Sequence, residues 1–348
     1  MKKIVIFILF CISLNAQVSV NNENAWKKLD KYIYEDKTVM LISHMDKLIK
    51  TYPNNKYAHF YRGWTNMVKR DYNEAFLDFS KAISLDQNFS KAYAFKGYLL
   101  AFKLRECNES MEFLDKAIEL GTIEIYPHKK DEVRNLYYIK ADCYNNMGNY
   151  ELAMENINKA IKLFNQNSYT NSLYYRLRAD INFKMKKYDE AYKDIKEALN
   201  YATMLEKHKY YQDLANILFY QGNVADSYTY YQLAVLQNSD KSSKSFAQEL
   251  LNLGIVKWIM GDKESAKMDI KEAFEVDWHN ADIPFALGYM EHNYNEKDKA
   301  KIHFNIAKGL NPKILDEKRA KILSIPTTND NLKAYFEGEI SVAVEYVF

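Results

Sequence analysis

The sequence contains few residues that interrupt regular structure, with only 10 Gly and 5 Pro among 348 residues. Glycine and proline mark most tight turns, so their scarcity disfavours folds built from many short strands. Aromatic residues are abundant instead, with 29 Tyr and 18 Phe. A long chain that is poor in turn-forming residues and rich in bulky ones is expected to be all-helical.

Neither sign of charge is in excess. The chain has 48 Lys+Arg against 46 Asp+Glu, and loss of a leader containing Lys2 and Lys3 would make the two equal. Nucleic-acid binding depends mainly on clustered basic charge, so this balance argues against a nucleic-acid partner. The 48% hydrophobic and 27% charged fractions exclude a disordered chain, a collagen and a multi-span membrane protein.

Residues 1–16 have the features of a secretory signal: two lysines, an apolar run over 4–14 and a small residue, Ala16, at the expected cut. The run is shorter than the roughly 20 apolar residues of a membrane-spanning helix. We therefore expect an exported bacterial protein of the periplasm, the cell envelope or the medium, with no integral span after cleavage. A retained amino-terminal anchor stays open, as does a lipid anchor on Cys11, although a large residue precedes this cysteine.

A repeat of about 34 residues extends along most of the chain. Eight repeats begin at Asn22, Lys56, Ser90, Arg134, Ser172, His208, Ala247 and Ala281. Position eight is Gly or Ala in seven of them, positions twenty and twenty-seven are mostly Ala, and position twenty-four is always large. The third repeat needs one extra residue in its turn to keep this phase.

This spacing has a mechanical meaning. Small residues at positions eight and twenty let two antiparallel helices approach closely, and the large residue at position twenty-four fills the space between them. Gly148, Gly222 and Gly261 stand where the first helix of a repeat must end in a left-handed residue. Each repeat is therefore predicted to be a helical hairpin that buries its apolar face only by stacking on its neighbours.

These residues resemble the tetratricopeptide repeat family, of an exported, bacterial type. The resemblance implies an all-α fold, a right-handed α–α superhelix of about eight hairpins with a carboxy-terminal capping helix and a short tail. Its layout is a degenerate capping hairpin at 22–55, seven repeats over 56–312 with an insertion near 124–133, a capping helix at 313–325 and a tail at 326–348.

The last residues of the tail show a different pattern. Ile340, Val342 and Val344 alternate with smaller or polar residues, which is typical of a strand over 339–348. A lone strand would have to pair with another chain. The alternative is a tail that frays or lies on the last hairpin.

The sequence contains no recognised enzyme motif, so we expect a non-enzymatic protein with no cofactor. His292 and His303 belong to one repeat but have no acidic partner at metal-ligand spacing, so we predict no metal site. Cys107 and Cys143 could pair in an oxidising compartment. The insertion between them makes a bond less expected than two free thiols, given the short distance that a disulfide requires.

The family resemblance places the partner-binding face at positions two, five, nine and twelve of each first helix. Many of these positions are aromatic and suit the anchoring of a protein or peptide segment, although individual side chains could instead pack onto neighbouring helices. Arg176 is the basic residue that is placed furthest inside this predicted face, and Asp142 and Asp180 would neutralise its charge. The candidate residues are Tyr57, Phe60, Trp64, Tyr98, Tyr138, Arg176, Phe183, Phe219, Trp258, Phe285 and Tyr289.

The sequence thus favours an interaction scaffold that binds an unidentified protein or peptide. Two other functions stay open: a carbohydrate or cell-wall binding module that uses the same aromatic residues, and a structural subunit of an envelope assembly that uses the carboxy-terminal strand. Neither the ligand nor the oligomeric state can be read from a repeat scaffold, because the fold alone does not specify what is bound.

Overall fold

The structure is a computed structural model that describes residues 38–121, 129–163, 171–325 and 329–346. Every regular element in these ranges is helical and none is a strand, so the prediction of an all-helical chain is confirmed. The chain divides into two compact units, Met1–Asn167 and Ser168–Phe348. The predicted signal at 1–16 and residues 124–128 of the insertion near 124–133 lie outside the described residues, and the remaining residues of that insertion belong to the start of a helix.

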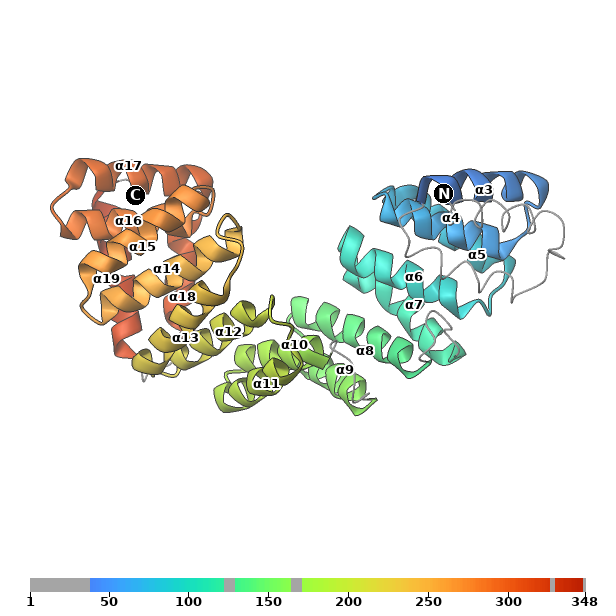
Figure 1. Cartoon of the computed structure of the whole chain (residues 1–348), viewed down its shortest axis with the longest axis horizontal. Helices are drawn as coiled ribbons and strands as arrows, with labels where there is room; N and C mark the ends of the chain where they lie inside the picture. Colours follow the sequence, from blue (N-terminus) through green and yellow to red (C-terminus); the bar gives the residue numbers. More distant parts are fainter. Residues whose placement is uncertain (1–37, 122–128, 164–170, 326–328, 347–348) are drawn as a thin grey trace. The chain divides into compact units, whose positions relative to one another are not determined.

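Within the first unit the helices pair along the chain, each packing on the next (Figure 1). First and second helices of the hairpins alternate along the chain. The elements are α3 (Thr38–Thr51), α4 (Lys56–Val68), α5 (Tyr72–Leu85), α6 (Ser90–Tyr98), the π-helical η1 (Leu99–Leu104), α7 (Cys107–Leu120), α8 (Lys129–Asn146) and α9 (Tyr150–Lys162).

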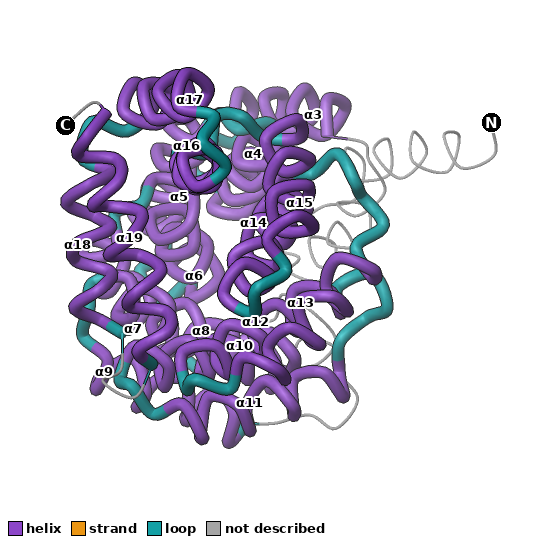
Figure 2. Tube along the Cα trace, turned by 90° about the vertical axis from the view of Figure 1, so that its left-hand side faces the viewer, coloured by secondary structure: helices purple, strands orange, loops and turns teal. Residues whose placement is uncertain are grey.

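The second unit continues the same alternation and ends in two further helices, α18 and α19. Figure 2 shows α18 and α19 side by side, and they are in contact. The elements are α10 (Asn171–Lys184), α11 (Tyr188–Tyr201), α12 (Lys207–Tyr220), α13 (Val224–Gln237), α14 (Lys244–Ile259), α15 (Lys263–Val276), α16 (Asp282–Asn293), α17 (Lys297–Leu310), α18 (Ile314–Ser324) and α19 (Asp330–Tyr346).

The small residues of the repeat lie where the paired helices touch. A Cβ added to Gly254 would lie 2.6 Å from Cγ1 of Ile270 and 3.0 Å from the carbonyl oxygen of Ala266, which are positions twenty-four and twenty of the same repeat. No side chain larger than hydrogen fits there unless Ile270 or the backbone of α15 shifts. Ala153 and Ala191, at position twenty of other repeats, are fully buried. The close approach predicted from the repeat is therefore present.

The turns inside the hairpins are also as predicted. Gly148, Gly222 and Gly261 have φ angles of 77°, 86° and 94°, the left-handed conformation that glycine adopts without a steric penalty. Lys186 and Asn295 occupy the same position of their repeats with φ angles of 60° and 59°. The extra residue of the third repeat is absorbed by η1, since a π-helical turn contains one residue more than an α-helical turn.

A buried ionic cluster recurs inside two hairpins. In α10 and α11, Arg178 binds Asp194 through Nε at 3.0 Å and through Nη2 at 2.6 Å, and Asn182 donates to the same carboxylate at 3.0 Å. In α4 and α5, Arg62 and Asp78 form the equivalent pair. The carboxylate therefore joins the two helices of its hairpin and is almost completely buried.

Replacing Asp194 with alanine is expected to lower the free energy of unfolding by about 2–3 kcal/mol, because the charged hydrogen bonds are lost and the half-buried Arg178 loses this carboxylate. Chemical denaturation followed by circular dichroism measures this. Asp180→Ala is the matched control: its ion pair with Lys184 is exposed, so the expected loss is below about 1 kcal/mol. Equal losses in the two variants would contradict the structural role of the cluster.

The prediction of a strand at the end of the tail is wrong for residues 339–346, which belong to helix α19. The alternation over 340–344 spans too few residues to distinguish a strand from a helix. Over the whole helix the apolar residues recur at helical spacing, and Ala343 is fully buried while Val344 is 45% exposed. The structure therefore removes the exposed strand on which pairing with another chain depended.

Candidate partner-binding faces

We call the surface formed by the first helices of successive hairpins the first-helix face. In the first unit it is built by α4, α6 and α8. Four of the predicted residues, Tyr57, Trp64, Tyr98 and Tyr138, are half-buried on these helices. Their rings rest on the apolar clusters of their hairpins and leave part of their surface to solvent. This is the arrangement expected of aromatic anchors for a partner.

Phe60 does not belong to this face. It is 1% exposed, and its ring centroid lies 5.3 Å from those of Phe89 and Phe95 and 5.7 Å from that of Phe79. These rings come from the second helix of its own hairpin and from the start of the next one. Prediction of Phe60 as a partner contact is therefore wrong: it is a core residue that joins two repeats.

In the second unit the first-helix face begins on α10 and α12. Arg176 on α10 forms an ion pair with Asp213 on α12 and is still 40% exposed. Burial raises the pKa of the Asp213 carboxyl, and the guanidinium opposes this shift. Asp180 pairs with Lys184, and the ion pair between Arg176 and Asp213 connects α10 to the first helix of the next repeat. Phe183 is half-buried, with its ring 5.0 Å from that of Tyr220.

The remainder of this face is covered by the end of the chain. Phe219, Trp258 and Phe285 are at most 7% exposed. The ring of Tyr289 lies 5.7 Å from that of Trp258 and 5.4 Å from that of Tyr335 on α19. The four candidate residues predicted on α12, α14 and α16 are therefore packed against the protein's own helices and are not open to a partner in this state.

The contact between α18, α19 and the repeats contains buried charge. Lys318 Nζ lies 3.0 Å from Asp282 and 3.2 Å from Glu339, and both Lys318 and Glu339 are almost fully buried. Burial raises the pKa of the Glu339 carboxyl, and the neighbouring ammonium group opposes this shift. For Lys318, burial works to lower the pKa, but the two carboxylates outweigh it and raise it.

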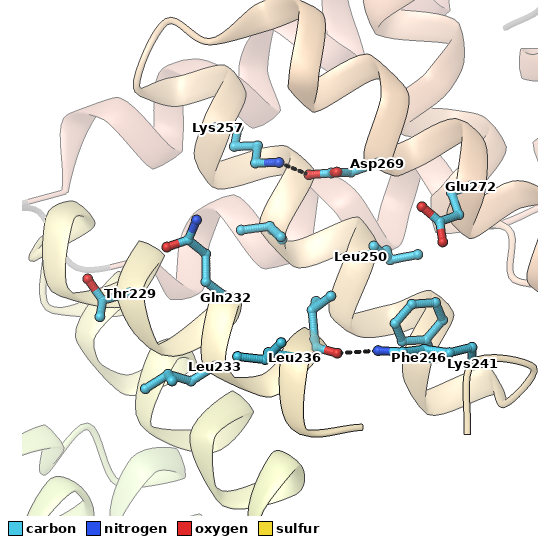
Figure 3. Close-up of a pocket in the computed structure, with 12 residues that line it drawn as sticks. Thr229, Gln232, Leu233, Leu236, Lys241, Phe246, Leu250, Lys257, Asp269 and Glu272 are labelled. Atoms are coloured by element: carbon cyan, nitrogen blue, oxygen red, sulfur yellow. Dashed lines mark hydrogen bonds and ion pairs between the residues drawn. The ribbon is translucent and has the colours of Figure 1, made fainter. Parts of the chain in front are cut away.

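Sequence reasoning missed a hollow of about 780 Å³ that α13, α14 and α15 line (Figure 3). Its wall includes Leu236, Phe246 and Leu250. Lys257 and Asp269 form an ion pair at 2.7 Å on its rim. None of the predicted residues lines it, and its signal in the sequence is a set of apolar residues on α13 and α14 outside the repeat positions. Its lining residues on α14 are separate from Leu251, Ile255 and Trp258, which belong to the first-helix face.

A disulfide joins Cys107 to Cys143, with their Cα atoms 5.4 Å apart. The sequence favoured two free thiols, and the structure corrects this. Arg105, in the left-handed conformation after η1, turns the chain so that Cys107 at the start of α7 reaches α8. The bond therefore links the third and fourth repeats directly, whatever the length of the insertion between them.

His292 and His303 do not converge. The first contacts the hydroxyl group of Tyr346 at 2.9 Å, and the second contacts the carboxylate of Glu291 at 2.6 Å. Across the residues that the structure describes, no three His, Cys, Asp or Glu side chains are placed to hold a metal ion. None of the described helices combines the length and apolar character needed to span a membrane.

Comparisons with known proteins support the interpretation of these hairpins as members of a known repeat family. The sequence profile of the tetratricopeptide repeat matches residues 135–167. TPR repeat-containing protein MJ1428 of Methanocaldococcus jannaschii is 28% identical over 214 residues, which make up 54% of this chain and 36% of the relative. The chain thus spans about a third of the length of this curated relative.

Solved structures with the same fold have low sequence identity to this chain. The Cut9–Hcn1 hetero-tetramer of APC/C has a TM-score of 0.57 at 10% identity, covering 96% of this chain and 58% of that one. A tetratricopeptide repeat protein from Parabacteroides merdae has 0.53 at 16% identity, covering 75% and 97%. PilF of Pseudomonas aeruginosa has 0.52 at 17% identity, covering 68% and 98%. The stacked hairpins define an α-solenoid of the tetratricopeptide repeat type, and the repeat itself is matched over residues 135–167.

Proposed function

We propose that this chain is a non-enzymatic scaffold that binds a protein or peptide segment on the first-helix face of its first unit. One observation carries the proposal: Tyr57, Trp64, Tyr98 and Tyr138 are half-buried on three successive first helices. Among the described residues of that unit, the main helix contacts are between neighbours along the chain, with no helix crossing this face as α19 crosses α14 and α16. These four aromatic side chains are therefore only partly buried, whereas Phe219, Trp258 and Phe285 of the second unit are at most 7% exposed.

The chemistry of this face favours a protein segment. Tyrosine and tryptophan supply a large contact area with few rotatable bonds, and such residues carry most of the binding energy in protein interfaces. Met67 packs beside Tyr57 and Trp64 on the same apolar cluster, and its flexible thioether can adapt to an apolar side chain of a partner. Carbohydrate binding through the same rings is the second candidate, and competition by cell-wall glycans distinguishes the two.

The double substitution Tyr57→Ala, Trp64→Ala is expected to weaken partner binding by at least about 30-fold, since a single anchor in an interface centre already contributes about 2 kcal/mol. The partner is first identified by affinity capture with the full chain, and its Kd is then measured by calorimetry. Phe60 is left unchanged because its loss would disturb the core.

The control is Leu77→Ala, which removes a 59% exposed side chain from the second helix α5. Its Kd should equal that of the unchanged protein. Binding that survives the double substitution in a folded protein would move the partner to another surface, and binding that glycans abolish would favour the carbohydrate candidate.

Export to an oxidising compartment forms part of the same proposal. The pairing of Cys107 with Cys143 supports it, because disulfides persist mainly outside the reducing cytosol. The signal-like residues 1–16 support it independently. Amino-terminal sequencing of the protein recovered from the periplasm or medium should begin at Gln17, and recovery of an uncleaved cytosolic protein would refute export.

A further inference from the structure

A basic side chain at position seven connects neighbouring repeats at several places in the chain. In the second repeat, Nε and Nη2 of Arg62 donate to Asp78, at position twenty-three of the same repeat, at 2.9 Å and 2.7 Å. The Nη1 atom donates to Asp46, at position twenty-five of the preceding repeat, at 2.9 Å. Lys140 makes the latter connection to Asp115, from the fourth repeat to the third. Position seven thus holds a cation beside the second helix of the preceding repeat.

The seventh repeat keeps the acceptor of this arrangement and changes the donor. In the fifth repeat, Arg178 at position seven and Asn182 at position eleven both donate to Asp194 at position twenty-three. The seventh repeat has Asp269 at position twenty-three, but its position seven is Leu253. A leucine cannot donate a hydrogen bond or neutralise a carboxylate.

Lys257 stands at position eleven of the seventh repeat, in the place of the asparagine. Its Nζ atom lies 2.7 Å from Asp269. The side chain of Asp269 is nevertheless 16% exposed, compared with 3% for Asp78 and 8% for Asp194. Burial raises the pKa of the Asp269 carboxyl, and the charge of Glu272 adds to this shift, whereas Lys257 opposes it. Asp269 can therefore accept a further cationic donor of the kind that its counterparts already bind.

The hollow between α13 and α15 takes the place of the cation at position seven. Leu253 and Asp269 both line it, and so does Gln232, at position twenty-five of the preceding repeat (Figure 3). Helix α14 begins at Lys244, before the first position of its repeat, and Phe246 in this added turn lines the hollow as well. The hollow of about 780 Å³ therefore lies among the positions that surround Arg62 in the second repeat.

This hollow lies on the opposite side of α14 from the first-helix face. Its lining residues on α14 are Phe246, Leu250, Leu253 and Lys257, and their spacing of i, i+4, i+7 and i+11 places them along one side of the helix. Ile255 of the first-helix face is two residues away from both Leu253 and Lys257, about 200° around the helix from each. A ligand in the hollow would thus be independent of the first-helix face.

The hollow is larger than one basic side chain needs. Its volume is in the range of ligand-binding pockets, and much of its wall is apolar. Leu236 on α13 is 73% exposed, and Phe246 and Leu250 on α14 line the hollow beside it. These residues suit the apolar neighbour of a basic residue in a protein segment.

The charges of the hollow direct a cation to one end. Asp269 and Glu272 on α15 are two carboxylates beside the single ammonium group of Lys257. Lys241, which precedes α14, is at the other end of that helix, where it donates to the carbonyl oxygen of Val235 at 2.6 Å. An incoming basic group is therefore attracted to Asp269 and repelled from the end at which Lys241 lies.

We propose that the hollow is a second binding site for a partner protein, which inserts an arginine whose guanidinium group binds Asp269. The guanidinium group takes the place that Arg62 and Arg178 take in their own repeats, where its planar fork binds a carboxylate through two nitrogen atoms. Leu236 and Leu250 pack on an apolar residue beside this arginine. The site lies on the second unit and goes beyond the function proposed for the first unit.

Leu253→Arg tests whether a guanidinium group fits beside Asp269, because it supplies the cation from within the chain. In urea denaturation, Asp269→Asn is expected to lower the folding equilibrium constant at least about tenfold more in the Leu253→Arg background than in the unchanged chain. Leu253→Met is the matched control, and in that background Asp269→Asn should act as in the unchanged chain. A Leu253→Arg protein that cannot fold, or equal effects of Asp269→Asn in all backgrounds, would overturn the proposal.

The binding probe is a fluorescent peptide in which one arginine is flanked by leucines. In anisotropy titrations the unchanged protein is expected to bind it at least about tenfold more tightly than the same peptide with citrulline, which has the shape of arginine without its charge. Asp269→Asn and Leu253→Arg should each weaken binding at least about tenfold. Glu275→Gln, which removes an exposed charge of α15 outside the hollow, is the control and should leave the Kd unchanged. Equal affinity for the two peptides, or for the unchanged protein and Asp269→Asn, would overturn the proposal.

Two further titrations identify the source of the arginine and the surface that binds it. Free arginine should compete at least about tenfold less effectively than the peptide, and equal competition would show a small-molecule site and overturn a protein partner. The double substitution Tyr57→Ala, Trp64→Ala should leave the Kd of the arginine peptide unchanged. Loss of peptide binding in that variant would place the peptide on the first unit and overturn the proposal. The function proposed for the first unit is therefore tested separately from this site.

Discussion

Phe60→Ala is expected to lower the free energy of unfolding by about 3–5 kcal/mol, the largest effect of a single substitution that we predict. The side chain is buried among Phe79, Phe89 and Phe95, so its removal leaves a cavity between two repeats that rigid neighbouring rings cannot fill. Urea denaturation followed by circular dichroism measures the loss.

Trp64→Ala is the comparison for that experiment, since Trp64 lies on the same helix but is only half-buried. The decrease in the free energy of unfolding should be clearly smaller for Trp64→Ala, and the main effect of this substitution should be on partner binding. If Phe60→Ala were no more destabilising than Trp64→Ala, Phe60 would be a surface contact, as the repeat position alone suggested.

The double substitution Cys107→Ser, Cys143→Ser is expected to lower the free energy of unfolding by about 2–4 kcal/mol, because the bond restricts the unfolded chain over a sequence separation of 36 residues. A thermal melt of oxidised protein should lie several degrees above that of the variant. Dithiothreitol should lower the melting temperature of the unchanged protein and leave the variant unaffected. Identical melts of oxidised and reduced protein would contradict a structural bond.

The hairpins could be predicted from the sequence because their determinants are local. Positions eight, twenty and twenty-four lie within one repeat, and their sizes decide how closely two helices pack, as Gly254 and Ile270 show. The left-handed turn residues follow from the same logic. These contacts repeat along the chain, so a single sequence contains many independent instances of each rule.

The accessibility of the candidate residues could not be predicted, because it depends on contacts that the repeat does not encode. Phe60 is closed by aromatic residues of the next repeat. Tyr289 is covered by Tyr335, far along the chain on α19. The repeat phase identifies which way a side chain points, whereas burial depends on which segment packs there. At the end of the chain two patterns overlap: buried residues recur at helical spacing from Leu332 to Ala343, and residues 340–344 also alternate as in a strand.

The disulfide shows a related limit of prediction from the sequence. The length of the insertion before α8 argued against a bond between Cys107 and Cys143. Solenoid packing brings successive repeats together irrespective of the chain that connects them, and the turn after η1 sets the position of Cys107. Sequence separation was therefore a poor guide to distance across this repeat boundary.

Site-specific photo-crosslinking tests the central claim most directly. A benzophenone amino acid in place of Trp64 is predicted to crosslink the identified partner, whereas the same group in place of Trp258 should crosslink α19 of its own chain, and one in place of the exposed Leu77 should do neither. Partner crosslinks at Leu77 but not at Trp64, or none to α19 from position 258, would contradict the account of one open and one self-occupied first-helix face.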